Sequence, residues 1–176
     1  KADVVWNEPV NGDLSSLPES PTAVSFITGT NTVIGSLSEP AGDLRDYMTF
    51  TIGANQRLTG LTLDALTASG PGFQGINSGN TSFIPSAGTA SSFLGLEFVL
   101  VDFIGTDMLP DLAAGANGST GFTIPLGPGT YSYVIQEITP GQSTIYQLSF
   151  NVVPEPSTAG LLCLAGLLSA VRRRRR

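Results

Sequence analysis

The sequence contains no histidine in 176 residues, and only 12% of its residues are charged, where about 25% is usual. Without histidine the chain cannot build a Ser-His-Asp or Cys-His couple, a histidine general base at neutral pH or a histidine-bound zinc site. Its lone cysteine, Cys163, cannot form an internal disulfide. Hydrophobic residues make up 41% of the chain, which is enough for the core of one domain. We therefore expect a folded, non-enzymatic protein that requires no cofactor for catalysis.

The few charges are divided unevenly along the chain. Residues 1–153 hold 3 basic residues against 13 acidic ones, a net charge of −10. Residues 154–176 hold five arginines against Glu155, a net charge of +4. The overall charge of −6 is therefore the sum of two unlike parts. We expect an acidic domain at residues 1–153 and a separate functional segment at residues 154–176.

Alternation of apolar and polar side chains is the main pattern in the acidic part. In residues 144–152 every second side chain is apolar and these share one face: Tyr146, Leu148, Phe150 and Val152. Residues 130–138 alternate in the same way, with Tyr131, Tyr133 and Ile135 on one face. This pattern is typical of β-strands that bury one face and expose the other. The five residues between the two runs, TPGQS, have the composition of a hairpin loop.

Further strands are predicted from apolar or β-branched runs that are separated by Gly, Pro, Asn and Ser. These runs lie at residues 23–27, 31–37, 47–52, 58–66, 93–103 and 121–126. About eight strands at regular spacing predict an all-β fold, an antiparallel β-sandwich or jelly roll. Because no window keeps a period of 3.6 residues, helices in this domain should be short. Residues 69–92 are rich in Gly, Ser, Asn and Thr and predict a long loop.

Two groups of acidic residues are candidates for cation binding. Asp43 and Asp46 precede a predicted strand, and Asp102, Asp107 and Asp111 surround a glycine turn. Oxygen-rich loops can bind calcium, which takes six to eight oxygen ligands. Loop acids also cap turns through hydrogen bonds to the backbone and keep a surface soluble. Both interpretations stay open, and Asp43 with Asp46 is the candidate calcium pair.

Catalysis and sugar stacking are weaker interpretations of the same domain. A carboxylate pair such as Asp43 and Glu97 has the chemistry for glycoside hydrolysis, but the sequence gives no separation between them. The aromatic residues could stack on sugars, although most alternate in step with the apolar strand residues, which predicts a place in the core. These aromatic residues are Trp6, Tyr47, Tyr131, Tyr133 and Tyr146.

The composition changes abruptly after Val153. The segment PEPST at residues 154–158 contains two prolines that break regular structure, and residues 159–171 carry no charge. A helix of residues 157–171 would be about 22 Å long, shorter than the roughly 30 Å hydrocarbon core, and snorkelling arginines or local bilayer thinning would close the gap. We expect one short C-terminal transmembrane helix. A buried core helix with a basic end is the alternative interpretation.

Five consecutive arginines directly follow the apolar run. Such a cluster stops translocation and, by the positive-inside rule, stays in the cytoplasm. The acidic domain would then lie on the opposite, periplasmic side of the inner membrane. Because the arginines have no interleaved aromatic residues and belong to an acidic protein, we expect no nucleic acid as a partner.

The residues 153–158, VPEPST, followed by a short Leu- and Gly-rich span and a terminal arginine cluster, closely resemble the PEP-CTERM sorting signal of bacterial exosortase substrates. The resemblance covers about the last 24 residues. It implies an N-terminal signal peptide, transient insertion in the inner membrane, and processing by an exosortase near Pro154, Glu155 and Pro156. It further implies transfer to the cell surface or an extracellular polysaccharide matrix. The residues that would anchor the chain and stop its transfer are Leu161, Leu162, Leu164, Leu167, Leu168, Arg172, Arg173, Arg174, Arg175 and Arg176.

The acidic domain has a second resemblance. The runs GTNTVIGS at residues 29–36 and GDLRDYMTF at residues 42–50 look like the opening of bacterial pre-peptidase C-terminal-type sandwich domains. Those domains carry a Gly-Asp-x-Asp-Tyr-Phe-x-Phe stretch, from which this chain differs by one inserted residue between the acids and by Met48. Calcium binding in some relatives carries over to Asp43 and Asp46 alone.

Two functional hypotheses follow from the sequence. The first is a non-enzymatic exported protein that an exosortase sorts to the cell surface or the polysaccharide matrix. The second is a carbohydrate- or calcium-binding module that acts in that matrix.

Overall fold

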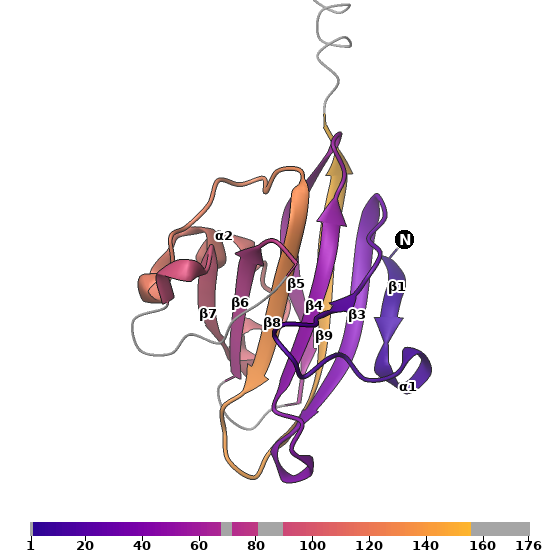
Figure 1. The fold of residues 1–176 in the computed structure, drawn as a ribbon, viewed down its shortest axis with the longest axis vertical. Coiled ribbons are helices and arrows are strands. Elements are labelled where there is room, and N and C mark those ends of the chain that lie inside the picture. The colour runs from indigo at the N-terminus through magenta and orange to yellow at the C-terminus, as the bar shows by residue number, and fades with distance from the viewer. Residues whose placement is uncertain (1, 68–71, 81–89, 156–176) are drawn as a thin grey trace, which may run out of the picture.

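The computed structural model describes residues 2–67, 72–80 and 90–155. These residues form nine strands in two sheets, which lie one behind the other in Figure 1. The prediction of an all-β domain with two packed sheets is confirmed. The predicted transmembrane helix falls on residues 157–171, which lie outside the described residues.

The first sheet has four strands in the order β1-β3-β9-β5. Their bounds are Ala2–Asn7 for β1, Gly29–Ser38 for β3, Ser143–Pro154 for β9 and Gln56–Leu66 for β5. The central strand β9 pairs antiparallel with β3 on one side and with β5 on the other. At the edge, β1 pairs parallel to β3. The longest strand of the protein therefore lies in the middle of this sheet.

The second sheet has five strands in the order β2-β4-β8-β6-β7. Their bounds are Thr22–Ala23 for β2, Arg45–Ile52 for β4, Gly129–Glu137 for β8, Gly72–Ser78 for β6 and Gly95–Val99 for β7. All neighbours pair antiparallel except β2 and β4, which are parallel. The two parallel pairs, β1–β3 and β2–β4, depart from the purely antiparallel arrangement predicted.

Helices are short, as the absence of a 3.6-residue period predicts. The α-helices are α1 at Glu8–Asn11 and α2 at Leu109–Ala113, and single 3₁₀ turns are η1 at Glu39–Ala41, η2 at Ala90–Ser92, η3 at Val101–Phe103 and η4 at Ala116–Gly118. Within the described ranges, none of these helices has the length and hydropathy needed to cross a membrane.

The core lies between the two sheets and is built largely by the predicted alternation. Tyr146, Leu148, Phe150 and Val152 of β9 are each at most 1% exposed. Their rings and methyl groups meet inward residues of the other sheet, for example Phe150 against Phe50 with ring centroids 5.6 Å apart and against Tyr133 at 5.5 Å. Burying each such aromatic side chain contributes roughly 1.5–3 kcal/mol. The predicted inward faces of β8 and β9 are therefore confirmed. Tyr131, Tyr133 and Tyr146 lie in the main core, Trp6 packs against it partly buried, and Tyr47 is buried in a smaller second cluster.

The predicted long loop at residues 69–92 is wrong in part, because Gly72–Ser78 forms strand β6 between β8 and β7. The glycines of this strand are typical of loops, so the sequence does not indicate a strand here. One of them, Gly75, is required by the packing. A Cβ atom at Gly75 would lie 2.8 Å from the Phe93 ring and 2.9 Å from Leu96. The strand therefore packs closely against the segment that covers the outer face of its sheet.

The outer face of β8 is also less exposed than the alternation predicts. Val134 points away from the main core but is 0% exposed, and it forms a second small cluster with Tyr47, Phe93 and Leu96. The chain segment that contains η2 crosses this face and supplies Phe93. The second sheet thus has both faces covered over β8.

Three other predicted strands are shorter or missing. Residues 93–103 contain the strand β7 only at Gly95–Val99, after which the chain turns into η3. Residues 121–126 form no strand apart from a single bridge between Leu126 and Leu58. Pro125 has no amide hydrogen to donate, so this run cannot continue a ladder. Of the predicted strand at residues 23–27, only Ala23 lies in a strand, the two-residue β2.

Substitution of Gly75 tests the assignment of β6. Gly75→Ala should lower the free energy of unfolding by about 1–3 kcal/mol, because the new methyl group overpacks against Phe93 and Leu96. Gly127→Ala is the matched control, since its Cβ would meet only Arg57 Nη1 at an ordinary 3.8 Å. Urea unfolding of a fragment of residues 1–155 measures both. Equal, near-zero effects at the two positions would contradict the close packing of β6.

Candidate functional site

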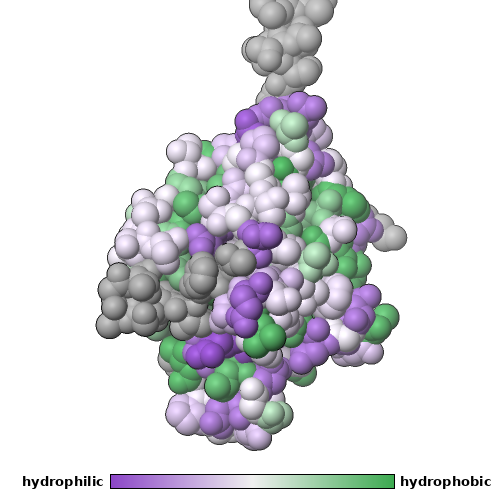
Figure 2. Space-filling model, in the orientation of Figure 1, coloured by the Kyte–Doolittle hydropathy of each residue, from purple (hydrophilic) through white to green (hydrophobic). Residues whose placement is uncertain are grey.

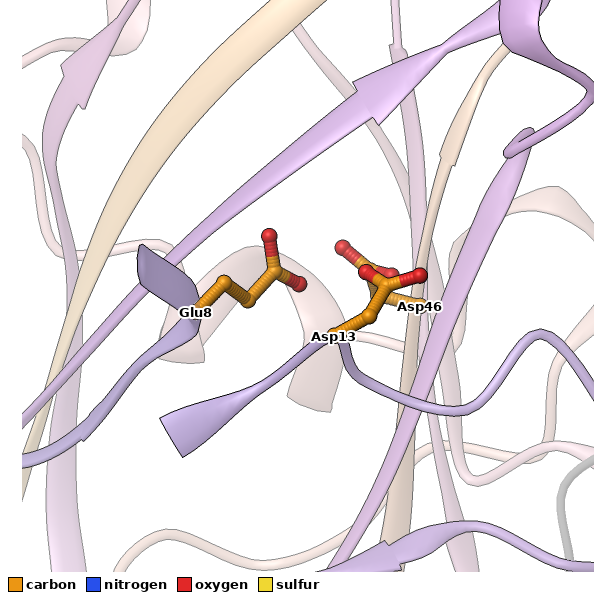
Figure 3. A group of neighbouring side chains, drawn as sticks. All are labelled: Glu8, Asp13 and Asp46. Carbon is orange, nitrogen blue, oxygen red and sulfur yellow. The ribbon is translucent and has the colours of Figure 1, made fainter. Parts of the chain in front are cut away.

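Three carboxylates from distant parts of the sequence meet at one end of the sandwich. Glu8 begins α1, Asp13 follows that helix, and Asp46 lies in β4. One oxygen from each carboxylate lies within 4.8 Å of those of the other two. Figure 3 shows the three side chains pointing toward one another. We call this group the carboxylate cluster.

Glu8 ties the N-terminal segment to the first sheet. Its Oε1 accepts a hydrogen bond from the Leu14 amide at 3.2 Å, and its Oε2 accepts from the amide and hydroxyl of Ser36 in β3 at 2.6 and 2.9 Å. Burial raises the pKa of Glu8, and the nearby charge of Asp13 adds to this, whereas the hydrogen bonds from Leu14 and Ser36 oppose it. The side chain is 9% exposed, so it is held in one place.

Asp46 is the most buried member of the cluster, with 1% exposure. Its Oδ2 accepts a hydrogen bond from the Tyr146 hydroxyl at 2.7 Å, and its Oδ1 has no hydrogen-bond partner among the described residues. Burial, followed by the charge of Glu8, raises its pKa to about 9, although the Tyr146 bond acts in the opposite direction. A buried acceptor without a partner is unfavourable, so this oxygen has unused binding capacity.

A glycine makes the bond between Tyr146 and Asp46 geometrically possible. Gly35 of β3 is paired directly with Tyr146 of β9, and a Cβ atom at Gly35 would lie 2.2 Å from the tyrosine hydroxyl. The tyrosine ring therefore passes over Gly35 on its way to Asp46 in the other sheet. Only glycine leaves room for this route.

The predicted calcium pair is divided by the structure. Asp46 belongs to the carboxylate cluster, whereas Asp43 lies beside it, is half-buried and accepts a hydrogen bond from the Ser16 hydroxyl at 3.3 Å. Burial raises the pKa of Asp43, and the charge of Asp13 contributes to that rise. The sequence analysis missed Glu8 and Asp13. The oxygen-rich run NEPVNGD at residues 7–13 is the signal that could have revealed them.

The donor chemistry of the cluster fits a hard divalent cation. All three donors are carboxylate oxygens, which suit calcium or magnesium, and zinc would favour nitrogen or sulfur ligands. Glu8, Asp46 and Asp13 would hold the ion, with the unpartnered Oδ1 of Asp46 as an inner ligand. A bound cation would supply positive charge that offsets the mutual repulsion of three closely spaced carboxylates.

The other acidic group has a structural role. Asp107 Oδ1 accepts hydrogen bonds from the amides of Leu61 at 2.9 Å and Leu109 at 3.0 Å, which joins β5 to the start of α2. Asp102 and Asp111 are exposed and do not join it in a cation-binding group among the residues that the structure covers. For Asp107 the turn-capping interpretation is confirmed.

The first two residues of the predicted processing motif lie at the end of β9, with Pro154 inside the strand and Glu155 directly after it. Pro154 is the last residue of the strand and pairs with Gln56 of β5. The amide of Glu155 donates to the Asn55 carbonyl at 2.8 Å, and its carboxylate forms an ion pair with Arg57. Pro156, the five anchoring leucines and Arg172 to Arg176 lie outside the described residues. The proposed domain boundary after Val153 stays a prediction, and β9 runs across it.

The carboxylate cluster predicts how stability depends on pH without a divalent cation. Between about pH 4, where Asp46 ionises in the unfolded chain, and about pH 9, the folded state holds a proton that the unfolded state has lost. The free energy of unfolding should therefore fall as pH rises through this window, by up to about 1.4 kcal/mol per pH unit. The raised pKa values of Glu8 and Asp43 act in the same direction.

Asp46→Asn tests this assignment, because the amide cannot ionise and should remove most of the slope. Urea unfolding of residues 1–155 at several pH values in the presence of EDTA measures it. Asp111→Asn, which removes an exposed charge away from the cluster, should keep the slope of the unaltered protein. A slope that Asp46→Asn leaves unchanged would show that Asp46 does not retain the proton.

Comparison with known proteins bears on the end of the chain. The family model for the PEP-CTERM protein-sorting motif matches residues 152–176. No curated protein and no solved structure matches the chain, so the resemblance of residues 29–50 to pre-peptidase C-terminal-type domains stays a prediction. The matched residues include the whole Pro-Glu-Pro segment, the apolar run and the arginine cluster. The protein therefore carries, at residues 152–176, the PEP-CTERM motif that marks exported proteins for exosortase-dependent sorting.

Proposed function

We propose that this protein is an exported, non-enzymatic β-sandwich that an exosortase processes and sends to the cell surface or an extracellular polysaccharide matrix. The observation that carries the proposal is the sorting motif at residues 152–176. In the proposed topology the sandwich lies on the periplasmic side of the inner membrane. Residues 157–171 span the bilayer, and Arg172 to Arg176 remain in the cytoplasm until processing.

Two observations support a non-enzymatic role. The chain has no histidine. The two members of the candidate pair are far apart along the second sheet, because Asp43 directly precedes β4 and Glu97 lies in the edge strand β7. Across the sheet, Glu97 pairs with Gln74, which pairs with Ile135, which pairs with Asp46. The backbone of Glu97 therefore lies three strand spacings, or about 14 Å, from β4. Glycosidases hold their carboxyl groups about 5–9.5 Å apart. These two acids therefore favour separate structural roles.

Replacing the Pro-Glu-Pro motif tests the sorting proposal. In a host that contains an exosortase, the unaltered protein should reach the surface without Arg172 to Arg176. The combined change Pro154→Ala, Glu155→Ala and Pro156→Ala should leave most of the protein in the inner membrane with its arginines intact. Mass spectrometry of the mature C-terminus and membrane fractionation measure both.

Pro140→Ala, in the loop between β8 and β9, is the control for loss of proline alone and should be sorted normally. Surface material that retains the five arginines would contradict processing. Unchanged sorting of the triple variant would contradict the role of the motif.

We further propose calcium binding as a second function of the sandwich, because Asp46 Oδ1 has no hydrogen-bond partner among the described residues and lies within the carboxylate cluster. In a domain of net charge −10, a bound divalent cation would reduce repulsion from acidic polymers in the matrix. A sugar-stacking platform has less support, since Tyr47, Tyr131, Tyr133 and Tyr146 are buried.

Calorimetric titration of residues 1–155 with calcium chloride tests the second proposal. We expect one site with a Kd on the order of 10⁻⁴–10⁻³ M, the range of extracellular calcium modules. Asp46→Asn and Asp13→Asn should each weaken binding by about tenfold or more, because each removes a charged ligand. Asp111→Asn should leave it unchanged. No heat on titration, or equal binding by all variants, would exclude the carboxylate cluster as a calcium site.

A further inference from the structure

The sorting motif begins without a linker. Pro154 is still part of β9 and pairs with Gln56, and the Glu155 amide donates to the Asn55 carbonyl in the turn between β4 and β5. Figure 1 shows β9 ending at the tip of the molecule beside this turn. Two of the three Pro-Glu-Pro residues are therefore held by the folded sandwich.

The acidic side chain of the motif, Glu155, also forms an ion pair with the sandwich. Glu155 is the only acidic residue in 154–176, and Arg57 is one of only three basic residues in 1–153. The two side chains form an ion pair and are 27% (Arg57) and 31% (Glu155) exposed. Arg57 Nη1 also donates to the Gln56 carbonyl at 3.1 Å, which fixes the guanidinium beside the strand end. We call these contacts of Asn55, Arg57 and Glu155 the strand-end clasp.

We propose that the strand-end clasp is an autoinhibitory contact, and that Pro154 and Glu155 must separate from β5 before an exosortase can bind the motif. This inference rests on the proposed exosortase processing. Enzymes that bind peptides as extended strands use the backbone hydrogen-bonding groups of the peptide. In the closed clasp, the Asn55 carbonyl occupies the backbone amide of Glu155, and Arg57 occupies its carboxylate. Arg57 is thus a positioning residue that sets how often the motif is free.

The strength of the clasp suits a reversible gate. A partly exposed ion pair shifts such an opening equilibrium by about two- to fivefold, and a single backbone hydrogen bond at a strand end frays readily. Figure 2 shows a mainly hydrophilic surface at the tip where β9 ends. Pro154 is exposed and Glu155 is half-buried, so separating them from β5 uncovers little buried surface. Opening the clasp should therefore leave the rest of the sandwich folded.

A graded series at position 57 in the full-length chain tests the proposal. The rate of processing is followed by pulse-chase labelling in a host that contains an exosortase. Arg57→Lys keeps the charge and should be processed at nearly the normal rate. Arg57→Gln should be processed about two- to fivefold faster, and Arg57→Glu, which repels Glu155, faster still. Equal rates across the series, or slower processing of Arg57→Gln, would overturn the proposal.

A control and a second variant separate the clasp from general loosening of the sandwich. Thr59→Ala removes the hydrogen bonds of Thr59 with Asn151, which also join β5 to β9 but lie away from Glu155, and it should be processed at the normal rate. Insertion of a Gly-Ser-Gly-Ser segment between Val153 and Pro154 keeps residues 154–176 intact and detaches them from β9. It should raise the processing rate at least as much as Arg57→Glu.

The two proposals fail in different ways. If the unaltered chain is never processed, exosortase processing itself is contradicted. If the unaltered chain is processed but neither the Arg57 series nor the inserted segment changes the rate, only the clasp is contradicted.

Discussion

The pairing of β9 with both of its neighbours is the interaction on which the rest of the protein depends. This strand lies between β3 and β5, and its inward side chains supply much of the contact between the two sheets. Its first half places Tyr146 across Gly35 to reach Asp46, and its last residue is the first proline of the Pro-Glu-Pro segment. Core, carboxylate cluster and strand-end clasp are thus three consequences of one strand register. A shift of that register by one residue would turn the inward face outward and disconnect all three.

The carboxylate cluster and the strand-end clasp use charge in opposite ways. In the cluster, burial and the charge of Glu8 raise the pKa of Asp46 to about 9, so this side chain holds a proton at neutral pH. In the clasp, a scarce basic residue pairs with the one acidic residue of the motif at a partly exposed tip. The first arrangement joins the N-terminal segment to the sandwich. The second controls the residues through which the protein would leave the membrane. Arg57 is one of only three basic residues in residues 1–153, and it is the one that pairs with Glu155.

The sequence predicted features that are set by residues within one short segment, and it did not predict features that depend on contacts between distant segments. The alternation in residues 144–152 and the PEPST segment are local, and both led to confirmed predictions. Strand β6 was hidden because close packing requires Gly75, whose residue type normally marks loops. The run at residues 7–13 marks candidate ligands, but the sequence does not show that they meet Asp46. A parallel edge strand and a bridge between Ser15 and Tyr47 bring them together. The clasp was hidden because the two prolines predict a break at Pro154, whereas β5 extends the ladder to that residue.

The central claim is that the sorting motif begins inside the folded sandwich, and hydrogen exchange at the Glu155 amide tests it most directly. The full-length chain in detergent or membranes is exchanged at neutral pH, and single amides are measured by NMR or by mass spectrometry with fragmentation. Because this amide donates to the Asn55 carbonyl, it should exchange at least about tenfold more slowly than in an unstructured peptide of the same sequence. Exchange at the rate of the free peptide, with the middle of β9 still protected, would show that the motif is detached from the sandwich and would contradict this account.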